Sequence, residues 1–110
     1  MNSEIRYRIL KAVEEEPQIT QRELASKLGV SVGKVNYCLR ALMKKGFVKA
    51  KNFKNSSRKR QYMYKLTPQG VSERTRVTIA FLRVKSAEFD EIRAEIDRLE
   101  AQLTAEEANA

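Results

Sequence analysis

The sequence predicts a mainly α-helical fold with a small two-stranded β-wing, in which a compact N-terminal domain is followed by one long helix. Three observations predict it. Residues 20–46 carry the signals of two short helices joined by a tight turn, residues 47–66 read as two strands around a polar turn, and residues 71–110 contain neither Gly nor Pro. We therefore divide the chain into a domain over residues 1–66 and a helical segment over residues 67–110.

Capping signals mark the two short helices. Thr20 followed by Glu23 fits a capping box, and Gly29 allows the positive φ that ends the first helix. Ser31 suits the N-cap of the second helix, which runs to about Lys45. Apolar residues of both helices fall on one face, which predicts a helix-turn-helix packed on a core. That face consists of Leu24, Ala25, Leu28, Val35, Cys38, Leu39 and Leu42.

The opposite face of the second helix is polar and basic. Successive residues of an α-helix advance by about 100°, so residues opposite the apolar stripe point to solvent. Tyr, Arg, Lys and Asn side chains suit hydrogen bonding to base edges and phosphates in a major groove. An ordinary amphipathic hairpin with a solvated basic face would show the same pattern. The candidate DNA-binding residues on this helix are Ser31, Gly33, Lys34, Asn36, Tyr37, Arg40 and Lys44.

The charge distribution favours a nucleic-acid partner. The net charge is +8, but residues 1–66 carry sixteen Lys and Arg against five Asp and Glu, whereas residues 67–110 carry six against nine. No acid occurs between Leu24 and Ser72. Because a solvated surface normally mixes both signs, a long window without acids indicates a polyanionic partner, most simply double-stranded DNA.

The hairpin after the second helix is also basic. Phe47, Val48 and Ala50 read as one strand, and residues 60–66 return as a second strand with apolar residues in period two. Lys can protect a strand edge against aggregation, but one or two charges suffice for that. Six basic residues and no acid favour phosphate or minor-groove contact. They are Lys49, Lys51, Lys54, Arg58, Lys59 and Arg60.

The helical segment begins with Thr67 as N-cap and Pro68 at the first helical position. A helix to about Leu103 would be about 50 Å long, more than the small domain can cover. Apolar residues at steps of three and four predict a coiled-coil seam, and two copies of the chain would bury it as a homodimer. The candidate dimerisation residues are Leu82, Phe89, Ile92, Ile96, Leu99 and Leu103.

Details of the pairing stay open. Charge does not decide between parallel and antiparallel helices, and the alternative to pairing is a helix that folds back on its own chain. A second stripe, Val77, Phe81 and Val84, could seat against the domain or against a partner. We expect the final residues, AEEANA, to fray.

The N-terminal part predicts one more helix. Ser3 could cap a helix that ends near Glu15, with Leu10 at the edge of its buried stripe. Its buried residues would be Ile5, Ile9, Ala12 and Val13. Ile19 is predicted to form a short strand before the helix pair.

The composition argues against several other classes of protein. The chain has no His, no metal-ligand cluster and no Gly-rich phosphate loop, so we expect no metal site, no cofactor and no enzymatic activity. Cys38 is the only cysteine and falls in the apolar stripe, which favours a buried core residue over a redox-sensing thiol. No export signal or apolar span is apparent, so we expect a cytoplasmic protein that does not bind membranes.

The chain resembles the MarR-type winged-helix transcriptional regulators, and within them the small subgroup encoded beside bacterial exopolysaccharide loci. The resemblance covers roughly residues 3–100. It depends on the blocks "GVSVGKVNYCLRALMKKGFVKAKNFKNS" and "YKLTPQG". The first block, with Asn36-Tyr37-Cys38 and Asn52-Phe53-Lys54-Asn55, is the more specific. Regulators of the PadR type have a similar C-terminal helix and are the nearest alternative family.

The resemblance implies a dimeric, sequence-specific DNA-binding regulator, usually a repressor. It would place Lys34, Asn36, Tyr37 and Arg40 at groove-reading positions and residues 54–60 at the wing tip. Typical members have an additional helix ahead of the winged domain, whereas this sequence begins almost directly with the domain. We therefore expect dimerisation through the long helix alone, and any small-molecule effector stays unknown. The alternative is a winged-helix module for protein interaction or RNA binding.

Overall fold

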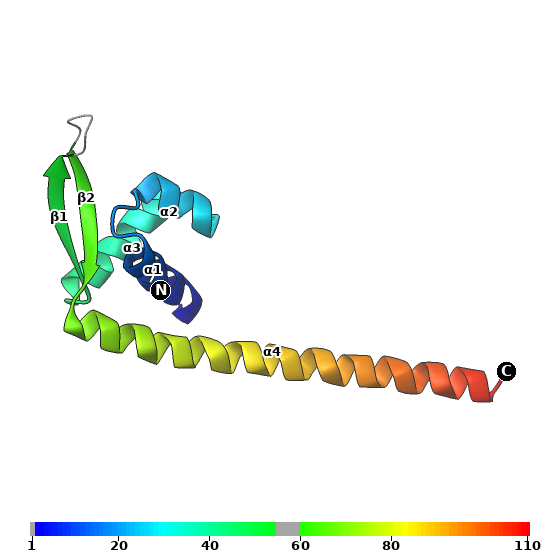
Figure 1. Cartoon of the computed structure of the whole chain (residues 1–110). Coiled ribbons are helices and arrows are strands. Elements are labelled where there is room, and N and C mark those ends of the chain that lie inside the picture. The colour runs from blue at the N-terminus through cyan, green and yellow to red at the C-terminus, as the bar shows by residue number, and fades with distance from the viewer. Residues whose placement is uncertain (1, 55–59) are drawn as a thin grey trace.

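One long helix projects from three short helices and a β-hairpin (Figure 1). This computed structural model describes residues 2–54 and 60–110, and the side chains of residues 2–52 and 62–110. The order of elements is α1 (Ser3–Glu15), α2 (Gln21–Leu28), α3 (Val32–Lys44), β1 (Val48–Lys54), β2 (Arg60–Leu66) and α4 (Pro68–Ala108). The predicted fold class, a winged helix-turn-helix with a long C-terminal helix, is confirmed.

The helix-turn-helix forms as its caps predict. The Thr20 hydroxyl accepts from the Glu23 N–H at 3.0 Å, and the Glu23 carboxylate accepts from the Thr20 N–H, which completes the capping box. Gly29 adopts φ 70°, a left-handed conformation that costs glycine little. Ser31 then caps α3 by accepting from the Lys34 N–H at 3.1 Å. These local interactions fix where α2 ends and α3 begins.

The N-terminal part differs from the prediction in three details. The N-cap of α1 is Asn2 and not Ser3, because the Asn2 side chain accepts from the Ile5 N–H at 2.9 Å. Leu10 is fully buried, since the other elements wrap around this edge of α1. The predicted strand at Ile19 is wrong: this residue is buried without belonging to a strand.

The wing is an antiparallel pair of strands. Its register runs from Val48 opposite Leu66 to Lys54 opposite Arg60, as expected for a hairpin that begins directly after α3. The Tyr64 N–H of β2 also donates to the Pro17 carbonyl at 2.8 Å, which ties the wing to the α1–α2 connection. The turn predicted at residues 54–57 lies largely outside the described residues.

The core lies where α1, α2, α3 and the base of the wing meet. Its largest fully buried side chains include Leu24 of α2 and Leu39 and Leu42 of α3. Cys38 is 3% exposed, which fits a core residue. Burying the apolar face of α3 leaves the opposite face of the same helix in solvent.

Helix α4 is anchored at its N-terminal end. The Thr67 hydroxyl accepts from the Gly70 N–H at 3.0 Å and donates to the Gly46 carbonyl. A Cβ at position 70 would lie 1.9 Å from the carbonyl oxygen of Phe47, so only glycine fits there. Further along, Val77 is 1% exposed against the domain. These contacts fix the direction in which α4 leaves the domain.

Beyond this anchor, α4 runs free of the domain (Figure 1). The helix continues to Ala108, whereas we expected it to fray after about Leu103. Of the second apolar stripe, Val77 and Phe81 pack on the domain, and Val84 stays exposed. Within the described chain α4 does not fold back, so its distal apolar residues face solvent.

A buried carboxylate joins α1 to α4. Glu73 accepts hydrogen bonds from Arg6 of α1 and from Arg76 one turn later on α4. The bonds from Arg76 lower the pKa of the Glu73 carboxyl below its usual value, burial opposes this effect, and Arg6 lowers the pKa further. A carboxylate held between two guanidinium groups restrains the orientation of α4.

Candidate nucleic-acid interface

The outward face of α3 is a surface of exposed polar side chains. Tyr37 is 72% exposed, and Lys34, Arg40 and Lys44 are also exposed. Gly33 has only the Ser31 hydroxyl near its missing side chain, at 3.9 Å, so a partner can approach the backbone there. All of these residues stand opposite the buried stripe, where the helical spacing places them.

Two predicted residues of α3 have structural partners. The Ser31 hydroxyl is engaged as the N-cap. Asn36 is half-buried, and its amide donates to the Gln21 side-chain oxygen at 3.3 Å. The Gln21 amide in turn donates to the Tyr64 hydroxyl at 3.2 Å. Asn36 is therefore held at the edge of the outward face by a chain of bonds that reaches the wing.

Sequence reasoning missed Gln21 and Tyr64 in this network. Tyr64 was assigned to the wing only as an apolar residue, and it is indeed 2% exposed. The three residues come from α2, α3 and β2, so no local spacing relates them. The only signal in the sequence is that Gln21 directly follows the helix cap, where a side chain can reach the next helix.

Strand β1 adds basic side chains beside α3. Lys49 and Lys51 are exposed, and Lys49 lies directly opposite Lys65 of β2. Like charges opposite each other destabilise a strand pair. A polyanion bound along the hairpin would relieve this repulsion. Arg58 and Lys59 lie outside the described residues, and Lys54 and Arg60 are described only as a backbone pair.

Acidic and basic groups are distributed differently over the domain. The acids of α1 pair with basic residues: Glu4 with Arg8, Glu14 with Arg74, Glu15 with Lys11 and Glu16 with Lys27. By contrast, among the described side chains no ion pair involves Lys34, Arg40, Lys44, Lys49 or Lys51. The basic groups of α3 and β1 therefore lack internal counter-charges.

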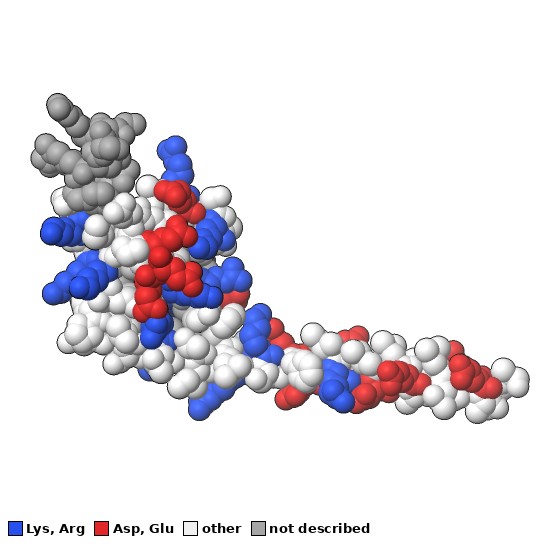
Figure 2. All heavy atoms as spheres, in the orientation of Figure 1, with Lys and Arg blue, Asp and Glu red and all other residues white. Residues whose placement is uncertain are grey.

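Figure 2 shows the α1 side of the molecule, with α3 running behind α1. Acidic and basic side chains are interleaved over this face of the domain, and basic side chains project along the flank below the hairpin tip. Acids dominate along the free part of α4. This side thus has the mixed charge of an ordinary solvated surface, unlike the α3 face.

The predicted seam of α4 is exposed along its whole length. Its apolar side chains are 47–61% exposed and belong to Leu82, Phe89, Ile92, Ile96, Leu99 and Leu103. Six large apolar residues in one line on a solvated helix form a surface that water does not favour.

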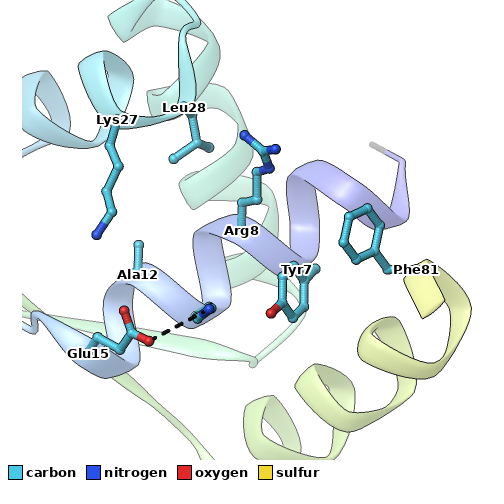
Figure 3. Close-up of a pocket in the computed structure, with 8 residues that line it drawn as sticks. Tyr7, Arg8, Ala12, Glu15, Lys27, Leu28 and Phe81 are labelled. Carbon is cyan, nitrogen blue, oxygen red and sulfur yellow. Dashed lines mark ion pairs between the residues drawn. The ribbon is translucent and has the colours of Figure 1, made fainter. Parts of the chain in front are cut away.

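A recess of about 340 Å³ lies between α1, α2 and α4 (Figure 3). Tyr7 and Phe81 form one wall as a stacked pair with ring centroids 5.1 Å apart. The remaining lining is mostly charged: Arg8, Lys11, Glu15 and Lys27, with Ala12 and Leu28. The sequence gave no indication of this recess, because it depends on the position of α4 against α1.

Other kinds of site have little support. Within residues 2–54 and 60–110, no group of three His, Cys, Asp or Glu side chains is placed to hold a metal ion. In the same residues, every helix is too short or too polar to cross a membrane.

Comparisons with known proteins agree with the fold. Residues 2–49 match the family described as winged helix-turn-helix DNA-binding. A search of curated proteins finds no match to the sequence.

Several solved structures of transcriptional regulators are similar in fold. A PadR-like regulator from Bacillus cereus has a TM-score of 0.69 at 18% identity, over 79% of this chain and 89% of its own. BldR from Sulfolobus solfataricus has a TM-score of 0.64 at 18% identity, over 90% and 73%. A variant of ZitR from Lactococcus lactis has a TM-score of 0.62 at 21% identity, over 93% and 73%. At these identities the likeness establishes the winged-helix fold alone.

Proposed function

We propose that this chain is a sequence-specific regulator of transcription that binds double-stranded DNA as a homodimer. The observation that carries the proposal is the outward face of α3, where Tyr37 is 72% exposed and the basic side chains lack internal counter-charges. Each subunit would lay α3 in a major groove and set the wing on the flanking backbone. The base-reading residues would be Lys34, Asn36, Tyr37 and Arg40, with phosphate contacts from Ser31, Gly33, Lys44 and the wing.

The homodimer is the second part of the proposal. The exposed seam of α4 supports it, because a second copy would bury all six apolar side chains at once. The fold likeness to MarR and PadR regulators supports a regulatory role. The resemblance of the "GVSVGKVNYC" block to the exopolysaccharide-locus subgroup suggests repression of such genes in the cytoplasm.

Selection of bound fragments from random duplex DNA, followed by sequencing, tests this function. We expect a motif with two-fold symmetry, whose half-sites lie about one helical turn apart or a multiple of it. Retention of duplex DNA, RNA and single strands at rising salt is the companion measurement. Enrichment of no motif would contradict sequence-specific binding. Preferential retention of RNA, or of no nucleic acid, would favour the RNA-binding or protein-interaction alternative.

Repression is tested separately with a reporter gene placed behind the selected motif. Expression should fall when the chain is present and recover when Arg40 is replaced by Ala. A rise in expression would make the protein an activator and leave its DNA binding intact.

A further inference from the structure

Helix α4 follows a seven-residue repeat that extends upstream of the predicted seam. If Phe89 is position a, the a positions are Thr75, Leu82, Phe89, Ile96 and Leu103, and the d positions are Val71, Thr78, Lys85, Ile92 and Leu99. Thr75 and Thr78 donate their hydroxyls to the carbonyls of Val71 and Arg74, one turn earlier. Their hydroxyls are thus satisfied within the helix, so their methyl groups can serve as the apolar part of the seam.

Lys85 does not have to interrupt this repeat. Its ammonium lies 3.1 Å from the Glu88 carboxylate and 5.3 Å from the ring centre of Phe81. Both partners occupy g positions, so the charge is drawn to the edge of the seam while the aliphatic stem stays on it.

The e positions change character along the helix. They are Ile79, Ser86, Arg93 and Glu100 in order, so the apolar member is the one beside the domain. Ile79 is 48% exposed. It borders a groove of about 380 Å³ whose floor includes Thr75 and Thr78, and whose opposite wall is formed by Tyr7 and Lys11 of α1. The groove therefore lies over the upstream end of the repeat.

From this arrangement we infer that two copies pair with their α4 helices parallel, and that Ile79 of each copy packs against α1 of the other. The inference deepens the proposed homodimer and rests on it. In a parallel pair the e position of one helix faces the g edge of the other, and α1 lies on the g edge, where Phe81 stacks on Tyr7. Ile79 of the second copy then enters the groove from the open side.

Apolar matching also favours the parallel pair. Parallel helices in register set each of the six seam residues against its own counterpart. The antiparallel alignment that brings Arg93 to Glu100 matches Ile92 with Leu103 and Ile96 with Leu99, but it sets Phe89 against Glu106. It also moves the second domain to the far end of α4, where its α1 cannot cover Ile79.

Disulfide trapping in the full chain tests the direction of the helices. With Cys38→Ser as background, Leu103→Cys should form a cross-linked dimer with itself, because parallel a positions face each other. A mixture of separate Leu103→Cys and Ile92→Cys chains tests the antiparallel alignment. Cross-linking only in the mixture would overturn the inference and leave the homodimer standing. A monomer at tens of micromolar by light scattering would overturn both.

The groove contact has its own matched pair of variants. Ile79→Lys and Val84→Lys replace aliphatic side chains that are 48% and 49% exposed, but Val84 points away from the seam. We expect Ile79→Lys to raise the dimer dissociation constant about tenfold or more, since two apolar contacts are lost per dimer. Val84→Lys should change it by less than about threefold. Equal effects of the two variants would overturn the packing of Ile79 on α1.

Discussion

The outward face of α3 and the seam of α4 are both exposed, but they offer a partner opposite chemistry. The α3 face presents Tyr37, Arg40 and Lys44 without internal counter-charges, whereas the seam presents apolar side chains such as Phe89 and Ile96. Water solvates the first surface readily and the second poorly. The difference teaches that exposure alone does not identify a partner. A cationic face calls for a polyanion, and an apolar line calls for a matching apolar line.

The largest predicted effect comes from a charge placed in the seam. Ile96→Asp should weaken dimerisation by about 3–6 kcal/mol, or roughly 10²–10⁴-fold, because two buried Ile side chains are lost per dimer. Sedimentation at a series of concentrations would measure this shift. Arg98→Ala, two residues further on the same helix, is the control and should leave the dimer intact. Equal dimerisation of the two variants would mean that the seam binds nothing.

The next effect separates the two faces of α3. Leu39 is fully buried, and Leu39→Ala should lower the free energy of unfolding by about 2–5 kcal/mol. Its neighbour Arg40 is exposed, and Arg40→Ala should change that free energy by less than about 0.5 kcal/mol. Denaturant titrations of both variants measure the contrast. Comparable losses of stability would show that Arg40 belongs to the core and cannot serve as a free reader of DNA.

A third prediction concerns the carboxylate that connects the two regions. Because the folded state lowers the pKa of Glu73, ionised Glu73 stabilises the fold above its usual pKa of about 4.3, and this contribution is lost as the pH falls through the lower, folded value. Glu73→Gln should therefore cost about 1.5–3 kcal/mol near pH 7 and show a weaker loss of stability in acid than the parent chain. Thermal unfolding between pH 7 and pH 3 measures this. Parallel pH profiles would exclude the proposed role of Glu73.

The smallest effect belongs to the wing. Lys51 is exposed on β1, so Lys51→Ala should weaken binding to selected and random duplexes alike. The slope of log affinity against log salt should fall by about one, as expected for the loss of one phosphate contact. Salt titrations on both duplexes measure the change. A loss confined to the selected sequence would instead make Lys51 a base-reading residue.

Local signals made most of the fold predictable. The caps at Thr20, Ser31 and Thr67 act within four residues, and the buried stripe of α3 repeats every three to four residues, so both were legible in the sequence. Features that join distant segments were not. The bond between Gln21 and Asn36, the burial of Leu10 and the groove beside Ile79 all depend on how elements meet in space.

The predicted interface follows the same division. Helical spacing correctly placed Tyr37 and Arg40 in solvent, because the apolar stripe on the other side fixes the rotation of α3. It could not foresee that Asn36 is held by Gln21, since the two residues lie on different helices. The predicted strand at Ile19 was wrong because a buried apolar residue can pack on the core without pairing to a strand.

Arg40→Ala tests the central claim, that the outward face of α3 reads DNA, most directly. The measurement is the ratio of affinities for the selected duplex and a random duplex, in the parent chain and in the variant. The account predicts that the ratio falls by the equivalent of about 1–3 kcal/mol, with discrimination lost at a single base pair. An equal loss of affinity for both duplexes would contradict it.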